Sequence, residues 1–151
     1  MGFWDSLKDH VNSMNRSLQT KVAKFKNAEF AAGSMAMCAI IAAADGNVDG
    51  AEKAKTAGLI ANNEALKVFP VAELKEKFDF FCGKLTADYS FGRIECLQAI
   101  GKLKKTEDQA RAVIQIGIII GGADGNFDAN EKKAVRDACF ALGINPTEFD
   151  L

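Results

Sequence analysis

The chain has 151 residues, of which 48% are hydrophobic and 26% are charged. This length and composition predict one soluble globular domain and exclude a disordered chain. The 19 basic and 20 acidic residues give a net charge of −1, which disfavours a nucleic-acid-binding protein, because such proteins usually have a strong basic excess. No apolar run approaches the length of about 18 residues that a membrane-spanning helix needs, and the first residues lack the pattern of a secretory signal.

An amphipathic helix is predicted over residues 1–27, where apolar side chains recur at intervals of three and four residues. They are Trp4, Leu7, Val11, Met14, Leu18, Val22 and Phe25. The segment carries five basic and two acidic residues, a local charge of +3, whereas the remainder of the chain has a charge of −4. Such a basic helix is typical of segments that lie on an anionic membrane surface or dock to a partner protein. The alternative is that the apolar stripe packs on the protein's own core.

Four cysteines are present, and no two of them have the close spacing of zinc knuckles or redox pairs. They are Cys38, Cys82, Cys96 and Cys139, each among apolar neighbours. We therefore expect four buried thiols in a reducing cytosol. The only histidine, His10, has polar neighbours and is expected on the surface, so the residues offer no nucleophile and base for catalysis.

One motif occurs twice, at an offset of 79 residues, and matches at seven of ten positions. The first copy, at 44–53, is Ala-Asp-Gly-Asn-Val-Asp-Gly-Ala-Glu-Lys, and the second, at 123–132, is Ala-Asp-Gly-Asn-Phe-Asp-Ala-Asn-Glu-Lys. An apolar segment precedes each copy, at 35–44 and 113–123, and a segment with helical spacing follows each, at 52–60 and 131–142. The sequence predicts two helix–loop–helix units, around 30–65 and 109–143, that are related by duplication.

Further helices are predicted between and after these units. Residues 71–85, opened by Pro70, and residues 91–104 carry apolar side chains at helical spacing. Gly143 is placed to end the helix before it, and Asn145 and Pro146 open a short terminal turn. We expect an all-α fold, a single compact domain of about seven helices, with the N-terminal helix over 1–27 and the duplicated helical domain over 28–151.

Oxygen ligands are concentrated in both copies of the motif, which reads Asp-Gly-Asn-x-Asp-x-x-Glu. The candidate metal ligands are Asp45, Asn47, Asp49, Glu52, Asp124, Asn126, Asp128 and Glu131. Carboxylate and amide oxygens suit a divalent cation such as Ca²⁺ or Mg²⁺, although the spacing is not that of an EF-hand loop. If the two units pack with twofold symmetry, the two loops lie on one side of the molecule. Otherwise each loop offers only a weak site of three carboxylates.

Helix capping explains part of the same motif without a metal. The second aspartate is a good N-cap, and the glutamate three residues later would complete a capping box in each copy. The motif glycines, Gly46 and Gly125, would end the preceding helices in a left-handed conformation. Capping does not explain why the first aspartate and the asparagine are identical in both copies. The first aspartate follows the C-terminal end of a helix, where the helix dipole disfavours a negative charge. Metal binding and capping alone both stay open at this point.

These residues resemble the TerB tellurite-resistance family. The resemblance rests on the paired motifs, on the start Phe-Trp-Asp-Ser-Leu-Lys, on Leu66-Lys67-Val68-Phe69 and on the ending Ala-Leu-Gly-Ile-Asn-Pro-Thr-Glu-Phe. It covers essentially the full chain. It implies an all-helical cytoplasmic bacterial protein that binds metal through the six acids of the two motifs. It further implies association, at the inner face of the membrane, with a TerC-like membrane protein and with calcium-binding TerD-like proteins.

Three functions fit the sequence. The first is a non-catalytic, cation-binding and protein-interaction module of a tellurite or metal-stress response, cytoplasmic and peripheral at the inner membrane. The second is a structural scaffold whose acids only cap helices. The third is a thiol-based reductase of the oxyanion, which needs an exposed cysteine of low pKa. We expect the first, with a divalent cation as cofactor and with no nucleic-acid partner.

Overall fold

A computed structural model describes residues 7–123, 125 and 127–151. In these residues it contains seven α-helices, three short 3-10 helices and no strand, which confirms the predicted all-α fold. Trp4 and the side chains of Leu7 and His10 lie outside the described parts of the chain.

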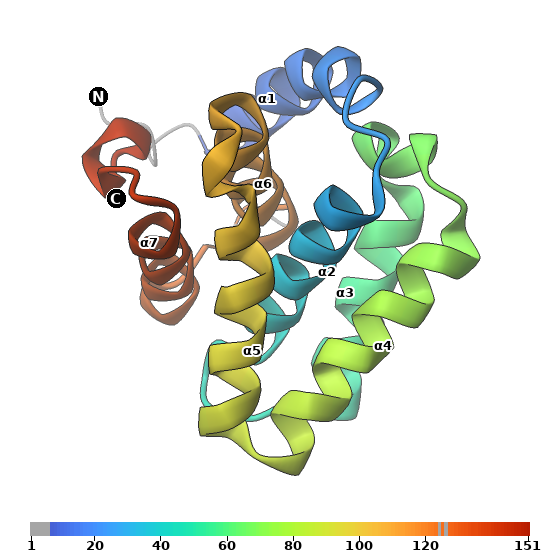
Figure 1. Ribbon diagram of the computed structural model, residues 1–151, viewed down its shortest axis with the longest axis vertical. Coiled ribbons are helices and arrows are strands. Elements are labelled where there is room, and N and C mark those ends of the chain that lie inside the picture. Colours follow the sequence, from blue (N-terminus) through green and yellow to red (C-terminus); the bar gives the residue numbers. More distant parts are fainter. Residues whose placement is uncertain (1–6, 124, 126) are drawn as a thin grey trace.

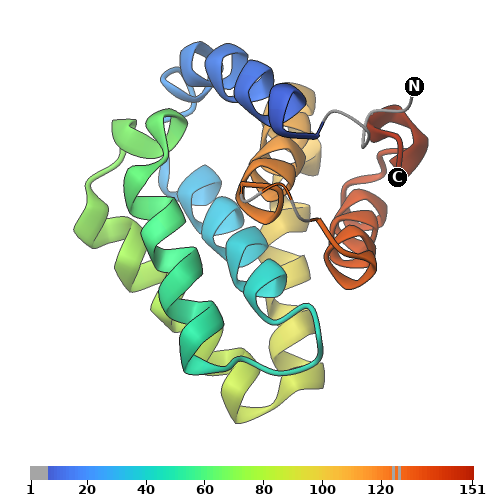
Figure 2. The same ribbon diagram turned by 180° about the vertical axis from the view of Figure 1, so that it is seen from behind.

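The helices are arranged around α2 (Ala28–Ala42), which runs through the middle of the molecule (Figures 1 and 2). Helix α1 (Leu7–Val22) lies across one end. On one side of α2 are α3 (Gly50–Asn62) and α4 (Val71–Ala87), and on the other are α5 (Tyr89–Gly101), α6 (Glu107–Gly121) and α7 (Ala129–Leu142). The 3-10 helices are η2 (Glu64–Val68), η3 (Lys102–Lys105) and η4 (Pro146–Phe149).

Helix α2 is the axis of the core, because twelve of its 15 residues are buried. A helix that is apolar on all sides has to be enclosed by other helices. Helices α4, α5 and α6 pack against it, and the side chain of Asn27 caps it by accepting a hydrogen bond of 2.8 Å from the Phe30 amide.

The apolar stripe of α1 packs on the protein's own core. Val11, Leu18 and Val22 are buried, and the helix lies against η2 and α6. Of the two alternatives for this stripe, packing on the core is therefore the one observed for these residues. In the part of the chain that the structure describes, no helix has the length and apolar character needed to cross a membrane.

The predicted helices are all present, with shifted boundaries. The first unit, predicted from about residue 30, begins with α2 at Ala28. The helices before the two motifs end at Ala42 and Gly121, two residues before the ends of the predicted apolar segments. Pro70 precedes α4, and Gly143 ends α7 with a φ of 70°. The Asn145 side chain caps η4, as predicted. The two helix–loop–helix units are both observed, as α2 with α3 and as α6 with α7.

Helices α4 and α5 approach each other closely at Gly92. A Cβ atom at Gly92 would lie 2.6 Å from backbone atoms of Lys84 and Leu85 in α4. On its other side, α5 is joined to α7 by an ion pair of 2.5 Å between Arg93 and Asp137. The position of α5 is thus fixed by a backbone contact that leaves no room for a side chain.

We predict that Gly92→Ala lowers the free energy of unfolding by about 2 kcal/mol or more, because the new methyl group meets backbone that cannot move aside cheaply. Gly83→Ala is the matched control in α4, since nothing lies within 4 Å of its Cβ position. This second change should stabilise the protein by about 0.5–1 kcal/mol through helix propensity. Urea unfolding of both variants measures the difference, and an equal effect of the two changes would contradict the packing described here.

Candidate cation site

Both motif loops begin with the same backbone turn. The Gly46 amide donates to the Ala43 carbonyl over 2.9 Å, and the Gly125 amide donates to the Gly122 carbonyl over 2.9 Å. The two glycines have φ values of 101° and 80°, in the left-handed region that favours glycine. The predicted left-handed glycines are confirmed, although they lie inside the loops rather than at the helix ends.

The apolar residue in the middle of the second loop closes the loop against α6. Phe127 is buried, and a Cβ atom at Gly121 would overlap its ring. The first motif has the smaller Val48 and, at the position of the glycine, Ala42. The two loops therefore share a backbone turn and differ in the size of the side chain that closes them.

The second aspartate of each motif caps the following helix, as predicted. Asp49 accepts a hydrogen bond of 2.7 Å from the Glu52 amide, and Asp128 accepts one of 2.8 Å from the Glu131 amide. In α7 the Glu131 carboxylate also accepts a bond of 3.0 Å from the Asp128 amide, which completes the capping box. In α3 the Glu52 carboxylate makes no such return bond to the Asp49 amide. The prediction of a second capping box is therefore wrong, and the side chain of Glu52 lines a hollow instead.

The first aspartate of the first motif is held loosely. Asp45 is exposed, and its carboxylate accepts a long bond of 3.4 Å from the Asn47 amide. Asp124 and Asn126, the counterparts of Asp45 and Asn47, lie outside the described residues.

The two loops come together because α2 and α6 cross near the ends from which the loops emerge. A Cβ atom at Gly117 of α6 would lie 3.0 Å from the side chain of Met37 in α2. Met37 is five residues before the end of α2, and Gly117 is four residues before the end of α6. At a rise of about 1.5 Å per residue, each helix ends within about 8 Å of this contact.

Carboxylates of both motifs line one hollow of about 150 Å³. Its lining residues are Ile41, Ala42, Ala44, Asp45, Glu52, Lys55, Asp128 and Glu131. Four of the six predicted acidic ligands thus meet there, and the two loops lie on one side of the molecule. Asp49 caps α3 and is not part of the lining.

The chemistry of this lining fits a hard divalent cation, because its anionic groups are all carboxylate oxygens. Among the described residues, however, no three acidic, cysteine or histidine side chains are already close enough to hold a metal ion. A cation at this position would therefore require the carboxylates to turn towards one another.

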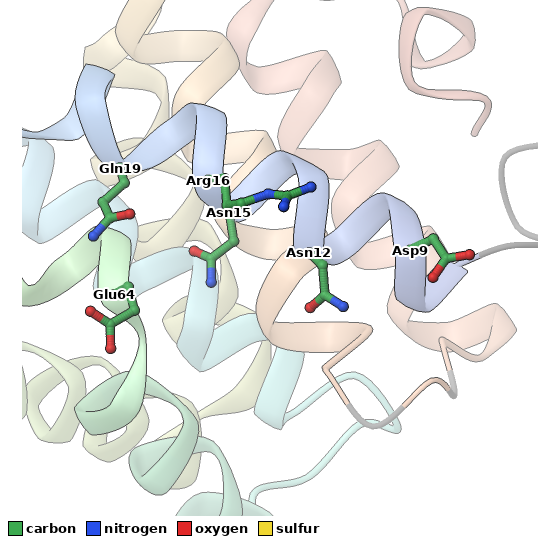
Figure 3. Close-up of a pocket in the computed structure, with 6 residues that line it drawn as sticks. All are labelled: Asp9, Asn12, Asn15, Arg16, Gln19 and Glu64. Carbon is green, nitrogen blue, oxygen red and sulfur yellow. The ribbon is translucent and has the colours of Figure 1, made fainter.

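A second hollow, of about 600 Å³, lies along α1 beside η2 (Figure 3). Its lining residues are Asp9, Asn12, Asn15, Arg16, Gln19 and Glu64. Figure 3 shows Asp9 at one end and Glu64 with Gln19 at the other, and between them lie Asn12, Asn15 and Arg16. Because its two carboxylates are separated, this hollow lacks the concentrated negative charge of the first.

Two residues, one at the start of the first loop and one in the lining of the hollow, were not indicated by the sequence. The hydroxyl of Tyr89 in α5 donates a hydrogen bond of 3.2 Å to the Ala43 carbonyl, where the first loop starts. Lys55 lines the hollow three residues after Glu52, on the same face of α3. A lone tyrosine carries no sequence signal of such a role. The three-residue spacing of Lys55 from Glu52 does carry one, because it places both side chains on the same face of a helix.

All four cysteines are buried, as predicted. Burial disfavours the thiolate and raises the pKa of the thiol to about 11 at Cys82 and Cys139 and to about 12 at Cys96. At neutral pH such thiols are almost entirely protonated and inaccessible, which argues against the thiol-based reductase.

Comparisons with known proteins match most of the chain. The family model described as tellurite resistance protein TerB matches residues 31–151, a segment that includes both motifs. A tellurium resistance protein TerB from Alcaligenes sp. is 34% identical over 118 residues, which cover 78% of this chain and 97% of that protein. The comparison with solved structures gives no match.

Proposed function

We propose that this chain, which belongs to the TerB tellurite-resistance family, is a non-catalytic module that binds a divalent cation, Ca²⁺ or Mg²⁺, and interacts with other proteins in a tellurite or metal-stress response. One observation carries the proposal: two motifs 79 residues apart bring carboxylates to one hollow. Carboxylates gathered in this way repel one another, and a cation among them relieves the repulsion.

The electrostatics of the helix ends support a cation on the side of the first loop. Asp45 follows the C-terminal end of α2, where the helix dipole disfavours a negative charge. Asp128 and Glu131 lie at the N-terminal end of α7, where the dipole favours them. A cation between the two loops would compensate the negative charge of Asp45, which the dipole of α2 disfavours.

Capping alone leaves part of the motif unused. Asp49, Asp128 and Glu131 all take part in capping bonds. Glu52 makes no return bond to its N-cap, and Asp45 accepts only the long bond from Asn47. Asp45 and Glu52, which capping does not employ, both line the hollow beside the capping residues Asp128 and Glu131. This favours cation binding over the structural scaffold.

We predict that Ca²⁺ or Mg²⁺ shifts the amide NMR signals of Gly46 and Gly125, one in each loop. Asp45→Asn should weaken the binding about tenfold or more, because the number of charged ligands sets the affinity of such sites. Titrations of the full chain with Ca²⁺, Mg²⁺ and Zn²⁺ measure both effects.

The matched control is Asp108→Asn, which removes the same charge from the first turn of α6, outside the hollow. It should leave the affinity unchanged within about twofold, because a distant surface charge is screened by salt. The proposal fails if the glycine signals do not move or if the two variants lose affinity equally.

We also propose that the protein is cytoplasmic and peripheral at the inner membrane, with TerC-like and TerD-like proteins as partners. A lysine-rich end of the molecule supports this. Lys21, Lys24 and Lys26 are exposed at the end of α1 and in the loop that follows. The ion pair of 2.9 Å between Lys105 and Glu29 brings the lysines of η3 next to the start of α2.

We predict that replacing Lys21, Lys24 and Lys26 together by glutamine lowers the affinity for vesicles containing phosphatidylglycerol at least about tenfold, because each lysine near an anionic surface contributes about 1 kcal/mol. Co-sedimentation at low and high salt measures it. Glutamine at Lys75, Lys77 and Lys84 of α4 is the charge-matched control. Charge changes test this better than deletion of α1, whose buried side chains belong to the core. Equal loss in the two triple variants, or binding that salt does not weaken, would contradict a role of this end of the molecule.

A further inference from the structure

One basic side chain lines the acidic hollow. Lys55 lies on α3 three residues after Glu52, and it shares the lining with carboxylates from both motifs, Asp45, Asp128 and Glu131. Residues three apart on a helix lie on the same face, so the ammonium group and the Glu52 carboxylate reach the same space. An ammonium group there competes with any divalent cation for the same oxygens.

We propose that Lys55 is a built-in counter-ion of this hollow, which stabilises the gathered carboxylates when no metal ion is bound and has to leave them when a divalent cation binds. The inference rests on the proposed cation-binding function and assigns a regulating residue to that site. Lys55 thereby lowers the affinity of the hollow for the divalent cation, because the cation must displace the ammonium group from the carboxylates.

The two motifs differ at this position. The residue 79 positions after Lys55 is Ala134, and among the described residues that line the hollow Lys55 is the only lysine. The lysine that both motifs do share, Lys53 in the first copy, forms an ion pair of 3.4 Å with Asp79 of α4. In the part of the lining that the structure describes, a single ammonium group from the first motif therefore serves a hollow that both motifs line.

The two lysines of α3 thus have different surroundings, although they are two residues apart. Asp79, the partner of Lys53, also pairs with Lys75 over 2.5 Å, and these neighbours keep the pKa of Asp79 below its usual value. Lys53 is accordingly held on the α4 side of the helix and is not part of the lining of the hollow. It provides a control of the same charge on the same helix.

The test compares Lys55→Met with Lys53→Met in the full-length protein. Methionine keeps an unbranched side chain and a good helix propensity while it removes the charge. Isothermal titration with Ca²⁺ and with Mg²⁺ gives the affinity, and thermal unfolding in the presence of a chelator gives the stability of the metal-free protein.

We expect Lys55→Met to bind the cation about three to ten times more tightly, because repulsion between the ammonium group and the divalent ion is removed. The same variant should be less stable than the wild type without metal and should recover that loss when the cation is added, since a ligand of the folded state stabilises it by mass action. Opposite changes in metal-free stability and in affinity are a signature that a purely structural lysine would not give. Lys53→Met should leave the affinity within about twofold of the wild type.

The outcomes separate this inference from the function on which it rests. If the wild type binds a cation and Lys55→Met binds it no more tightly, or if Lys53→Met tightens binding equally, the role of Lys55 is overturned and the cation site stands. If neither the wild type nor either variant binds Ca²⁺ or Mg²⁺, the proposed function is overturned and the role of Lys55 with it.

Discussion

The close crossing of α2 and α6 is the contact on which the candidate site depends. Gly117 allows the side chain of Met37 to lie directly against the backbone of α6. Both helices end within two turns of this contact, and residues of the two loops that follow line one hollow. The apolar character of α2 in turn requires the remaining helices to enclose it. The same burial that stabilises the fold therefore brings two distant acidic motifs to one hollow.

The near-zero net charge of the chain conceals this arrangement. Acidic groups gather where the two loops meet, and lysines gather where α1 joins α2 and where η3 lies. Each region has a local potential that the net charge of −1 does not express. The proposed cation site and the proposed basic surface for docking to an anionic membrane are compatible within one small domain, because they use different parts of its surface.

Much of the fold could be predicted because its signals are local. The helical spacing after Pro70, the left-handed Gly143 and the N-cap aspartates all act within a few residues of themselves, and all were found as predicted. Helix α2 begins at Ala28, close to the predicted start of the first unit around residue 30, and its first turn is capped by Asn27 ahead of the apolar run.

The site was less accessible to prediction because it is made by tertiary contacts. The sequence indicated candidate oxygen ligands but not whether the two loops meet, which depends on the contact between α2 and α6. The spacing of aspartate and glutamate predicts a capping box in both motifs, whereas in the first motif Glu52 lines the hollow. The hydrogen bond from Tyr89 to the first loop joins residues 46 positions apart, so no local sequence pattern predicts it.

The central claim is that the two motifs act as one cation site, and the most direct test is paramagnetic broadening by Mn²⁺, a hard cation that prefers oxygen ligands. Added to the ¹⁵N-labelled protein in amounts well below stoichiometric, Mn²⁺ should broaden the amide signals of Gly46 and Gly125 in parallel, and excess Mg²⁺ should restore both at the same concentration. Broadening of one loop without the other, or of scattered surface acids in place of both, would contradict the account.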